Sequence, residues 1–142
     1  MPRRRLFLLL LAAYALLMLW LMFLQRAPSP ERSCNLIPGR TLIQLWSLLG
    51  GRAELRRFAV TNLFGNVVMF LPLGLLPAIW PRLRRFGWFL FTVTVLILVL
   101  EGVQYLTRLG SADVDDLILN LIGAGLGFAI WKFCIKMQDR RT

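Results

Sequence analysis

The sequence predicts an all-α, polytopic membrane protein built as a bundle of four transmembrane helices. Hydrophobic residues make up 58% of the 142 residues, more than the core of a soluble protein of this size would need. Four apolar runs are long enough to cross a bilayer, and basic residues flank them. We therefore expect a single membrane domain over residues 1–142, with spans at about 6–24, 58–80, 86–105 and 114–133.

The first apolar run, from Leu6 to Leu24, follows three consecutive arginines and contains no charged residue. A secretory signal peptide begins in the same way. Its apolar region, however, spans only about 7–15 residues, and no small-x-small cleavage site follows this run cleanly. We therefore expect an uncleaved first helix.

A shorter segment, residues 39–55, lies between the first and second spans. Its polar residues recur with a 4-3-4-3 spacing, which places one polar stripe along an amphipathic helix. Such a helix would either lie in the membrane interface or re-enter the membrane, and both alternatives stay open for residues 36–55. The stripe consists of Arg40, Gln44, Ser47, Gly51 and Glu54.

The distribution of Lys and Arg predicts a multi-pass protein of a bacterial inner (plasma) membrane with both termini in the cytoplasm. With four spans and the N-terminus inside, ten of the 17 basic residues are cytoplasmic and seven lie outside. The net charge of +10 is explained by this flanking pattern, and no nucleic-acid-binding motif accompanies it. We expect membrane lipids as partners, and no nucleic acid.

The chain has no histidine, which excludes histidine-based catalytic triads and histidine-ligated zinc or haem. Its two cysteines, Cys34 and Cys134, fall on opposite membrane faces in the predicted topology, so we do not expect them to form a disulfide. No Cys-x-x-Cys spacing is present. The sequence therefore implies no cofactor and no metal centre built on histidine or cysteine.

Polar residues within and beside the spans gather at one predicted depth, near the extracytoplasmic side. On the second and third spans they occur in pairs, at i,i+4 and i,i+3, so each pair lies on one face of its helix. Together they form a candidate substrate-binding site, and the inner halves of the helices contribute almost nothing to it. The set consists of Asn35, Asn62, Asn66, Glu101, Gln104, Asp113, Asp115, Asp116 and Asn120.

A purely structural interpretation of the same residues is nearly as strong. A carboxylate inside a span, such as Glu101, costs several kcal/mol unless it is paired, protonated or hydrated, and amides and carboxyls often hydrogen-bond across membrane bundles. Asp113 is placed as an N-cap of the fourth helix, and Asp116 would favour the helix dipole. Capping leaves Asp115 without a role, and the acids together could hold a divalent cation.

Two further features predict close helix packing or bending. Gly123 and Gly127 form a G-x-x-x-G motif in the fourth span, which lets another helix approach closely. Pro72 removes a backbone donor from the second span, so we expect a kink there.

Residues 35 to 130 carry an ordered set of motifs that resembles the VanZ-like family. Each motif alone is weak, but the order and spacing of the set are specific. One departure concerns Arg108, which precedes Leu109-Gly110, whereas relatives often place an arginine after a glycine close to the acidic motif. The motifs are Asn35-Leu36-Ile37-Pro38, Asn62-x3-Asn66-x3-Phe70-x-Pro72-x-Gly74, Glu101-x2-Gln104 and Asp113-x-Asp115-Asp116-x3-Asn120-x2-Gly123.

The resemblance implies a multi-pass protein of the cell envelope. The family is named for a member linked to resistance to the glycopeptide teicoplanin, and this phenotype belongs to the outer face, where lipid-linked cell-wall precursors are exposed. No catalytic mechanism comes with the resemblance. The leading hypothesis is a protein that binds or modulates an outer-leaflet or cell-wall component. The alternatives are an enzyme acting on a lipid-linked substrate, with Glu101 as acid or base, and a structural bundle that packs against another membrane protein.

Overall fold

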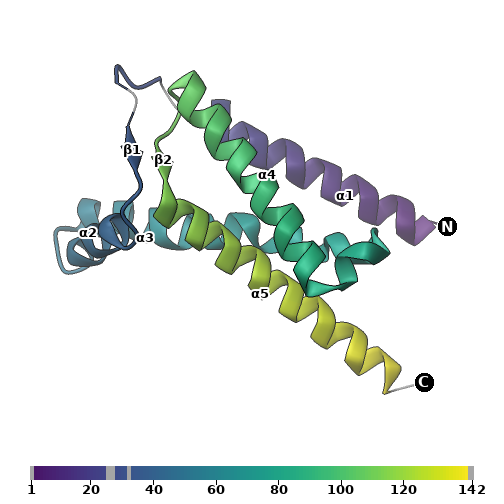
Figure 1. The fold of residues 1–142 in the computed structure, drawn as a ribbon. Helices are drawn as coiled ribbons and strands as arrows, with labels where there is room; N and C mark the ends of the chain where they lie inside the picture. Colours follow the sequence, from purple (N-terminus) through teal and green to yellow (C-terminus); the bar gives the residue numbers. More distant parts are fainter. Residues whose placement is uncertain (1, 25–27, 32, 141–142) are drawn as a thin grey trace.

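The computed structural model describes residues 2–24, 28–31 and 33–140, and it confirms the predicted fold class. Four helices are long and apolar enough to cross a membrane, and a short helix lies between the first two (Figure 1). The long helices are α1 (Pro2–Leu19), α3 (Ala53–Phe70), α4 (Phe86–Thr107) and α5 (Val114–Asp139), and the short one is α2 (Arg40–Leu48).

Two short strands join the connectors at one end of the bundle. β1 (Cys34–Asn35) pairs in parallel with β2 (Ala112–Asp113), so that Asn35 lies opposite Asp113. Helix α2 lies at the same end, which we call the strand end. Both termini lie at the opposite end, which we call the terminal end, together with the α3–α4 connection (Figure 1). An even number of spans requires this arrangement.

The segment expected to form one helix over residues 39–55 is divided in two. Helix α2 ends at Leu48, and Ala53 already belongs to α3. Gly50 and Gly51 lie at the break, where the N–H of Gly51 donates to the carbonyl of Leu48 at 3.0 Å. Two adjacent glycines disfavour a helix because they lose more backbone entropy on folding than other residues. The polar stripe is therefore interrupted at Gly51.

Helix α5 packs against α3 at backbone-to-backbone distance. A Cβ atom added to Gly123 would lie 2.1 Å from the carbonyl oxygen of Val67, and one added to Gly127 would lie 1.9 Å from that of Leu71. Across the same contact, a Cβ on Gly74 would lie 2.0 Å from the carbonyl carbon of Gly127. The prediction that the G-x-x-x-G motif permits close packing is confirmed.

Pro72 changes the helix type. After Phe70, α3 continues as a 3₁₀ segment, η2 (Leu71–Ala78). Proline has no backbone N–H, so a carbonyl one turn before it loses its helical donor. The hydroxyl of Tyr14 on α1 donates a hydrogen bond to the carbonyl oxygen of Met69, three residues before Pro72. The Tyr14 hydroxyl thus supplies a hydrogen-bond donor to a backbone carbonyl near the proline, where a helical N–H donor is missing.

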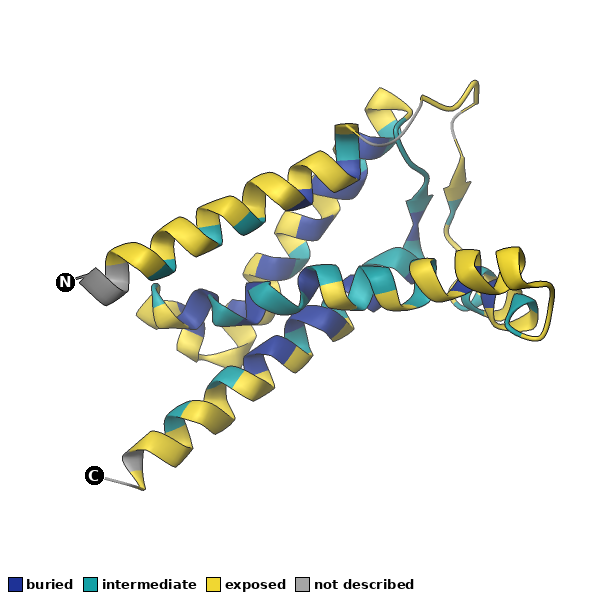
Figure 2. Cartoon of the chain, turned by 180° about the vertical axis from the view of Figure 1, so that it is seen from behind, coloured by how far each residue is buried: buried dark blue, intermediate teal, exposed yellow. Residues whose placement is uncertain are grey.

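Helix α1 is the least buried span. Of the residues in its apolar window 11% are buried, compared with 33% for the span that begins at Ala53. Figure 2 shows α1 exposed along most of its length, with its buried residues near its C-terminal end. Met18 and the π-helical turn η1 (Trp20–Leu24), through Met22, join the core. Helix α1 and η1 therefore pack against the rest of the bundle mainly near the strand end.

Candidate functional site

The carboxylate of Asp115 caps the N-terminus of helix α2. Asp115 is fully buried on the first turn of α5, and its oxygens accept from the backbone N–H groups of Gly39, Thr41 and Leu42 at 2.6, 2.8 and 3.1 Å. Gly39 has φ of 84°, a left-handed conformation that favours glycine, and it has no side chain to cap the helix itself. A residue 76 positions away therefore supplies the cap that α2 lacks.

Asp113 and Asn35 join this cap in one network. The Asn35 amide nitrogen donates to Asp113 Oδ1 and to Thr41 Oγ1, both at 3.0 Å, and the Thr41 hydroxyl donates to Asp113 Oδ2 at 2.6 Å. Asp113 also accepts from the N–H of Asp115 at 2.9 Å, which confirms its expected role as N-cap of α5. The network fastens α2, β1 and the start of α5 to one another.

Asn66 and Asp116 form a second contact, between α3 and α5. The Asn66 amide nitrogen donates to Asp116 Oδ1 at 2.7 Å. Asn62, one turn earlier on the same face of α3, instead donates to the carbonyl of Phe58 in its own helix at 2.8 Å. Both asparagines are half-buried, and they lie on the α1 side of α3.

The remaining three predicted residues lie inside the bundle. Gln104 is buried, and its amide nitrogen donates to the carbonyl of Met22 in the π-helical turn of α1 at 3.1 Å. Glu101, one turn earlier on α4, is 8% exposed, and Asn120 on α5 is 1% exposed. Among the described residues, Asn120 Oδ1 has no hydrogen-bond partner. Gln104 thus connects α4 to α1.

The nine predicted residues therefore belong to separate sets. Asn35, Asp113 and Asp115 hold α2 in place, and Asn66 with Asp116 joins α3 to α5. Glu101, Gln104 and Asn120 are buried in the bundle. The structure brings Asn62 and Asn66 together in the wall of a groove, and a substrate-binding role for the nine residues as a set stays a prediction.

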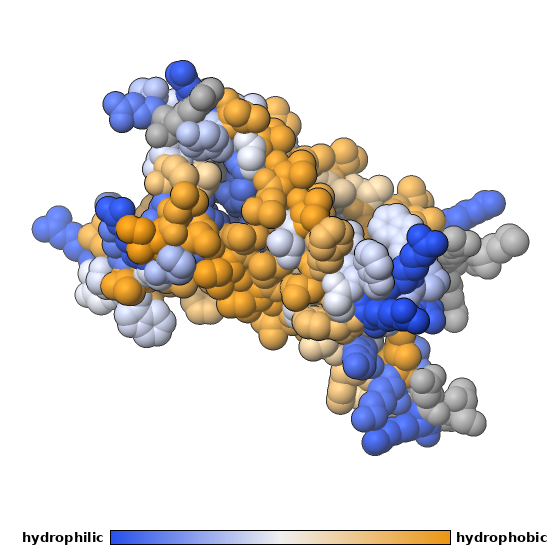
Figure 3. Space-filling model, viewed as in Figure 1, coloured by the Kyte–Doolittle hydropathy of each residue, from blue (hydrophilic) through white to orange (hydrophobic). Residues whose placement is uncertain are grey.

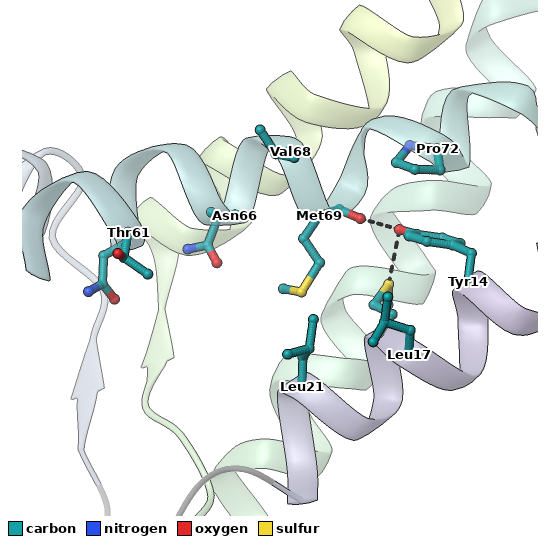
Figure 4. Close-up of a pocket in the computed structure, with 11 residues that line it drawn as sticks. Tyr14, Leu17, Leu21, Thr61, Asn66, Val68, Met69 and Pro72 are labelled. Carbon is teal, nitrogen blue, oxygen red and sulfur yellow. Dashed lines mark hydrogen bonds between the residues drawn. The ribbon is translucent and has the colours of Figure 1, made fainter. Parts of the chain in front are cut away.

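That groove separates α1 from α3 and has a volume of about 520 Å³. Figure 4 shows Leu17 of α1 and Leu21 of η1 facing Met69 and Asn66 of α3 across it, with Tyr14 closing one end through its hydrogen bond to Met69. The groove is mostly apolar. Its lining residues are Tyr14, Leu17, Met18, Leu21, Thr61, Asn62, Gly65, Asn66, Val68, Met69 and Pro72.

Sequence reasoning missed Thr41, Gly39 and Tyr14. A signal for the first two was present, because a glycine directly before a short helix cannot provide a side-chain cap and so requires one from elsewhere. Tyr14 is a single aromatic residue in an apolar run, and nothing local indicates that its hydroxyl reaches the carbonyl beside Pro72.

Four apolar helices, an interhelical groove with a polar end and a short, capped helix between the first two spans define a multi-pass helical membrane protein. The chain belongs to the VanZ/LLP1 family, whose model matches residues 11–135. It is similar to Protein VanZ of Enterococcus faecium, with 27% identity over 93% of this chain and 77% of that protein. No solved structure matches the chain.

Proposed function

We propose that this protein binds an outer-leaflet amphiphile of the class of lipid-linked cell-wall precursors in the groove between α1 and α3. Through this binding it would influence the access of glycopeptide antibiotics to the precursor. The groove carries the proposal, because it combines an apolar wall with two asparagines at its strand-end part. The family resemblance, which implies a link to teicoplanin resistance, points to the same class of ligand.

The chemistry of the groove suits a molecule with an apolar chain and a polar head group that forms hydrogen bonds. The amide nitrogens of Asn62 and Asn66 donate to protein acceptors at 2.8 and 2.7 Å. Within the part of the chain that the structure describes, no donor reaches either amide oxygen. Each asparagine thus offers an acceptor and a second N–H to a ligand.

An arginine lies one turn beyond this polar end. Arg57 precedes Thr61 by four residues on α3, so the two share a helical face, and Arg57 is exposed. A guanidinium binds phosphate by paired hydrogen bonds. In the proposed complex the polyprenyl chain lies along the apolar wall. Asn62 and Asn66 donate to the pyrophosphate next to it, Arg57 contacts the same pyrophosphate, and the sugar and peptide extend out of the groove.

Nothing in the groove favours the enzyme alternative. Glu101, the residue expected to act as acid or base, is buried in the bundle and is not among the residues that line the groove. A general acid or base must come within hydrogen-bond reach of the group it acts on.

Filling the groove tests the proposal. A Cβ on Gly65 would meet only the Thr61 methyl at 4.0 Å, so Gly65→Leu can be accommodated while its side chain occupies the groove. Gly125→Leu is the matched control, because a Cβ on Gly125 would meet nothing within 4 Å and the residue lies on α5, outside the groove. The probe is a polyprenyl-pyrophosphate-linked precursor added to the purified protein and measured by native mass spectrometry.

We expect Gly65→Leu to reduce retention of the precursor by about tenfold, which corresponds to about 1.4 kcal/mol, and Gly125→Leu to leave it unchanged. Teicoplanin susceptibility of cells expressing each variant should follow the same order. If the wild-type protein does not retain the precursor, or if both variants behave alike, the proposal is wrong.

The outer-leaflet part of the proposal requires the strand end to face outward, and the native cysteines can test this. Cys34 lies in β1 at the strand end and Cys134 lies near the C-terminal end of α5, and both are free and exposed. In intact spheroplasts a membrane-impermeant maleimide should label the Cys134→Ser variant and not the Cys34→Ser variant. The reverse result would place the groove's polar end in the inner leaflet.

A further inference from the structure

The terminal end of the protein carries a concentration of positive charge. Figure 3 shows hydrophilic residues gathered there, beyond the apolar middle of the bundle. The α3–α4 connection, residues 79–85, contains three arginines and no acidic residue, and the last turns of α5 contain one acidic residue, Asp139. The cationic residues there are Arg82, Arg84, Arg85, Lys132, Lys136 and Arg140.

Three hollows open beside this charge. One, of about 490 Å³, is lined by Trp80, Pro81, Arg82, Leu83 and Thr92, and Trp88 lines the other two. The larger of these two has a volume of about 680 Å³ and is lined by Pro81, Arg82, Leu83, Arg85, Trp88 and Thr92. The smaller, of about 510 Å³, is lined by Arg85, Gly87, Trp88 and Phe91. Arg85 and Trp88 line both of them, whereas Arg84 lines none of the three. Because neighbouring arginines differ in whether they line a hollow, a specific binding site here can be distinguished from a general basic flank of the spans.

Buried side chains on the same segment fix the backbone around the hollows. Leu83 lies in the short 3₁₀ turn η3 (Pro81–Arg84), and it and Phe89 are buried in the hydrophobic core. Trp88 packs edge-on against Phe91, with ring centroids 6.2 Å apart. A Cβ on Gly87 would meet nothing within 4 Å, so this glycine leaves the hollow of about 510 Å³ open. The arginines project from a fixed base.

The order of cationic, aromatic and apolar residues along this segment matches the order of phosphate, interfacial region and acyl chain in a phospholipid. Trp88 and Thr92 stand at i and i+4 and therefore share one face of α4, and Arg85 is the N-cap residue directly before the helix. From Arg85 along this face the character changes from cationic to aromatic, where tryptophan marks the membrane–water interface, and then to the apolar middle of the span. A phosphate would meet the arginines, and an acyl chain would pass Trp88 toward Thr92.

We propose that the hollow between Arg82, Arg85 and Trp88 is a binding site for the phosphate of an anionic phospholipid in the leaflet at the terminal end. Guanidinium groups bind phosphate oxygens in pairs, and basic pockets beside spans select anionic head groups. The site lies at the opposite end of the molecule from the polar end of the α1–α3 groove, so it does not depend on the function proposed above.

The test compares arginines of the same short segment. The purified full-length protein is exchanged with phosphatidylglycerol or phosphatidylcholine of identical acyl chains, and bound lipid is measured by native mass spectrometry. We expect the wild type to prefer phosphatidylglycerol, R82Q/R85Q to lose this preference by about fivefold to tenfold, and R84Q to keep it. W88A should lower retention of phosphatidylglycerol while leaving both arginines in place.

Arg84→Gln is the decisive control, because it removes the same charge from the same segment without lining any of the three hollows. If R84Q loses the preference as fully as R82Q/R85Q, the effect is general surface charge and the site does not exist. The absence of a preference in the wild type would also overturn the proposal. Should R82Q/R85Q fail to accumulate, R82K/R85K keeps the charge while removing the paired hydrogen bonds, and it should show a partial loss.

Discussion

Helix α3 and its 3₁₀ extension contact two neighbours in opposite ways. Against α5 the contact is backbone to backbone, because Gly123, Gly127 and Gly74 remove the side chains that would separate the two segments. Against α1 the contact is made by side chains, including the hydrogen bond from Tyr14 to Met69, and a groove of about 520 Å³ remains. The α3–α5 pair is the scaffold of the fold, and α1 is the wall that leaves room for a ligand.

The difference shows how a small membrane protein can have one closely packed helix pair and still keep a groove beside a third helix. Between helices in lipid there is little hydrophobic driving force, so association depends on close packing and hydrogen bonds. The α3–α5 contact uses close packing at Gly123 and Gly127, and the Asn66–Asp116 hydrogen bond adds to it.

Among the residues that the structure describes, the α1–α3 contact has one polar anchor, the Tyr14–Met69 hydrogen bond. The Gln104–Met22 bond at 3.1 Å joins η1, at the end of α1, to α4, and Met18 and Met22 pack in the core. Helix α1 is therefore held while a gap beside α3 remains.

The largest effect should come from placing a methyl group inside the α3–α5 contact. In Gly127→Ala the new Cβ would lie 1.9 Å from the Leu71 carbonyl oxygen, and backbone atoms cannot move aside as a flexible side chain can. We expect a loss of ~4 kcal/mol or more, and failure to accumulate in the membrane. Gly125→Ala, two residues earlier and in open space, should accumulate normally. Similar yields for the two variants would contradict the backbone-to-backbone contact.

A smaller loss is expected where α5 holds α2. Asp115→Asn keeps the shape of the side chain but turns an N–H₂ group toward backbone N–H donors that the carboxylate accepts at 2.6 to 3.1 Å. Removing charged hydrogen bonds of this kind should cost about 2–3 kcal/mol, and α2 should detach. Limited proteolysis at residues 36–52 would measure this detachment.

Glu54→Gln provides the control for the Asp115 variant. It removes the same charge from an exposed side chain in the first turn of α3, at the same end of the molecule. Its cleavage rate over residues 36–52 should match that of the wild type. Equal protection of α2 in both variants would show that the cap does not hold the helix.

Much of the scaffold could be predicted from the sequence, because its causes are local or compositional. The four spans follow from uninterrupted apolar runs, and the close contact at Gly123 and Gly127 follows from a spacing that needs no knowledge of the partner. Asp113 was recognised as an N-cap because the helix that it caps begins at the next residue.

The features that form the groove and dock α2 could not be predicted in this way. Asp115 caps a helix more than 70 residues away, and the Tyr14 hydroxyl donates to a carbonyl 55 residues away. No local sequence pattern predicts contacts between residues this far apart in the chain. The depth argument grouped all nine polar residues into one site, which stays a prediction. It could not distinguish Asn62 and Asn66, which face the groove, from Gln104 and Asn120, which face the interior.

The smallest effect should come from loosening α1. Tyr14→Phe keeps the ring and removes the hydroxyl that donates to the Met69 carbonyl, so we expect a loss of about 1 kcal/mol. The loss should be local: hydrogen exchange should quicken in the amides of α1 and in η2 just after Pro72, while α5 stays protected.

Thr94→Val is the matched control for this change. It also removes a hydroxyl-to-carbonyl hydrogen bond, of 2.8 Å to Leu90, but this bond lies within α4 and joins no two helices. Exchange in α1 should therefore be unaffected. If Tyr14→Phe and Thr94→Val change exchange in α1 equally, then Tyr14 is not an anchor. Packing of Met18 and Met22 against the core would then hold α1 in place.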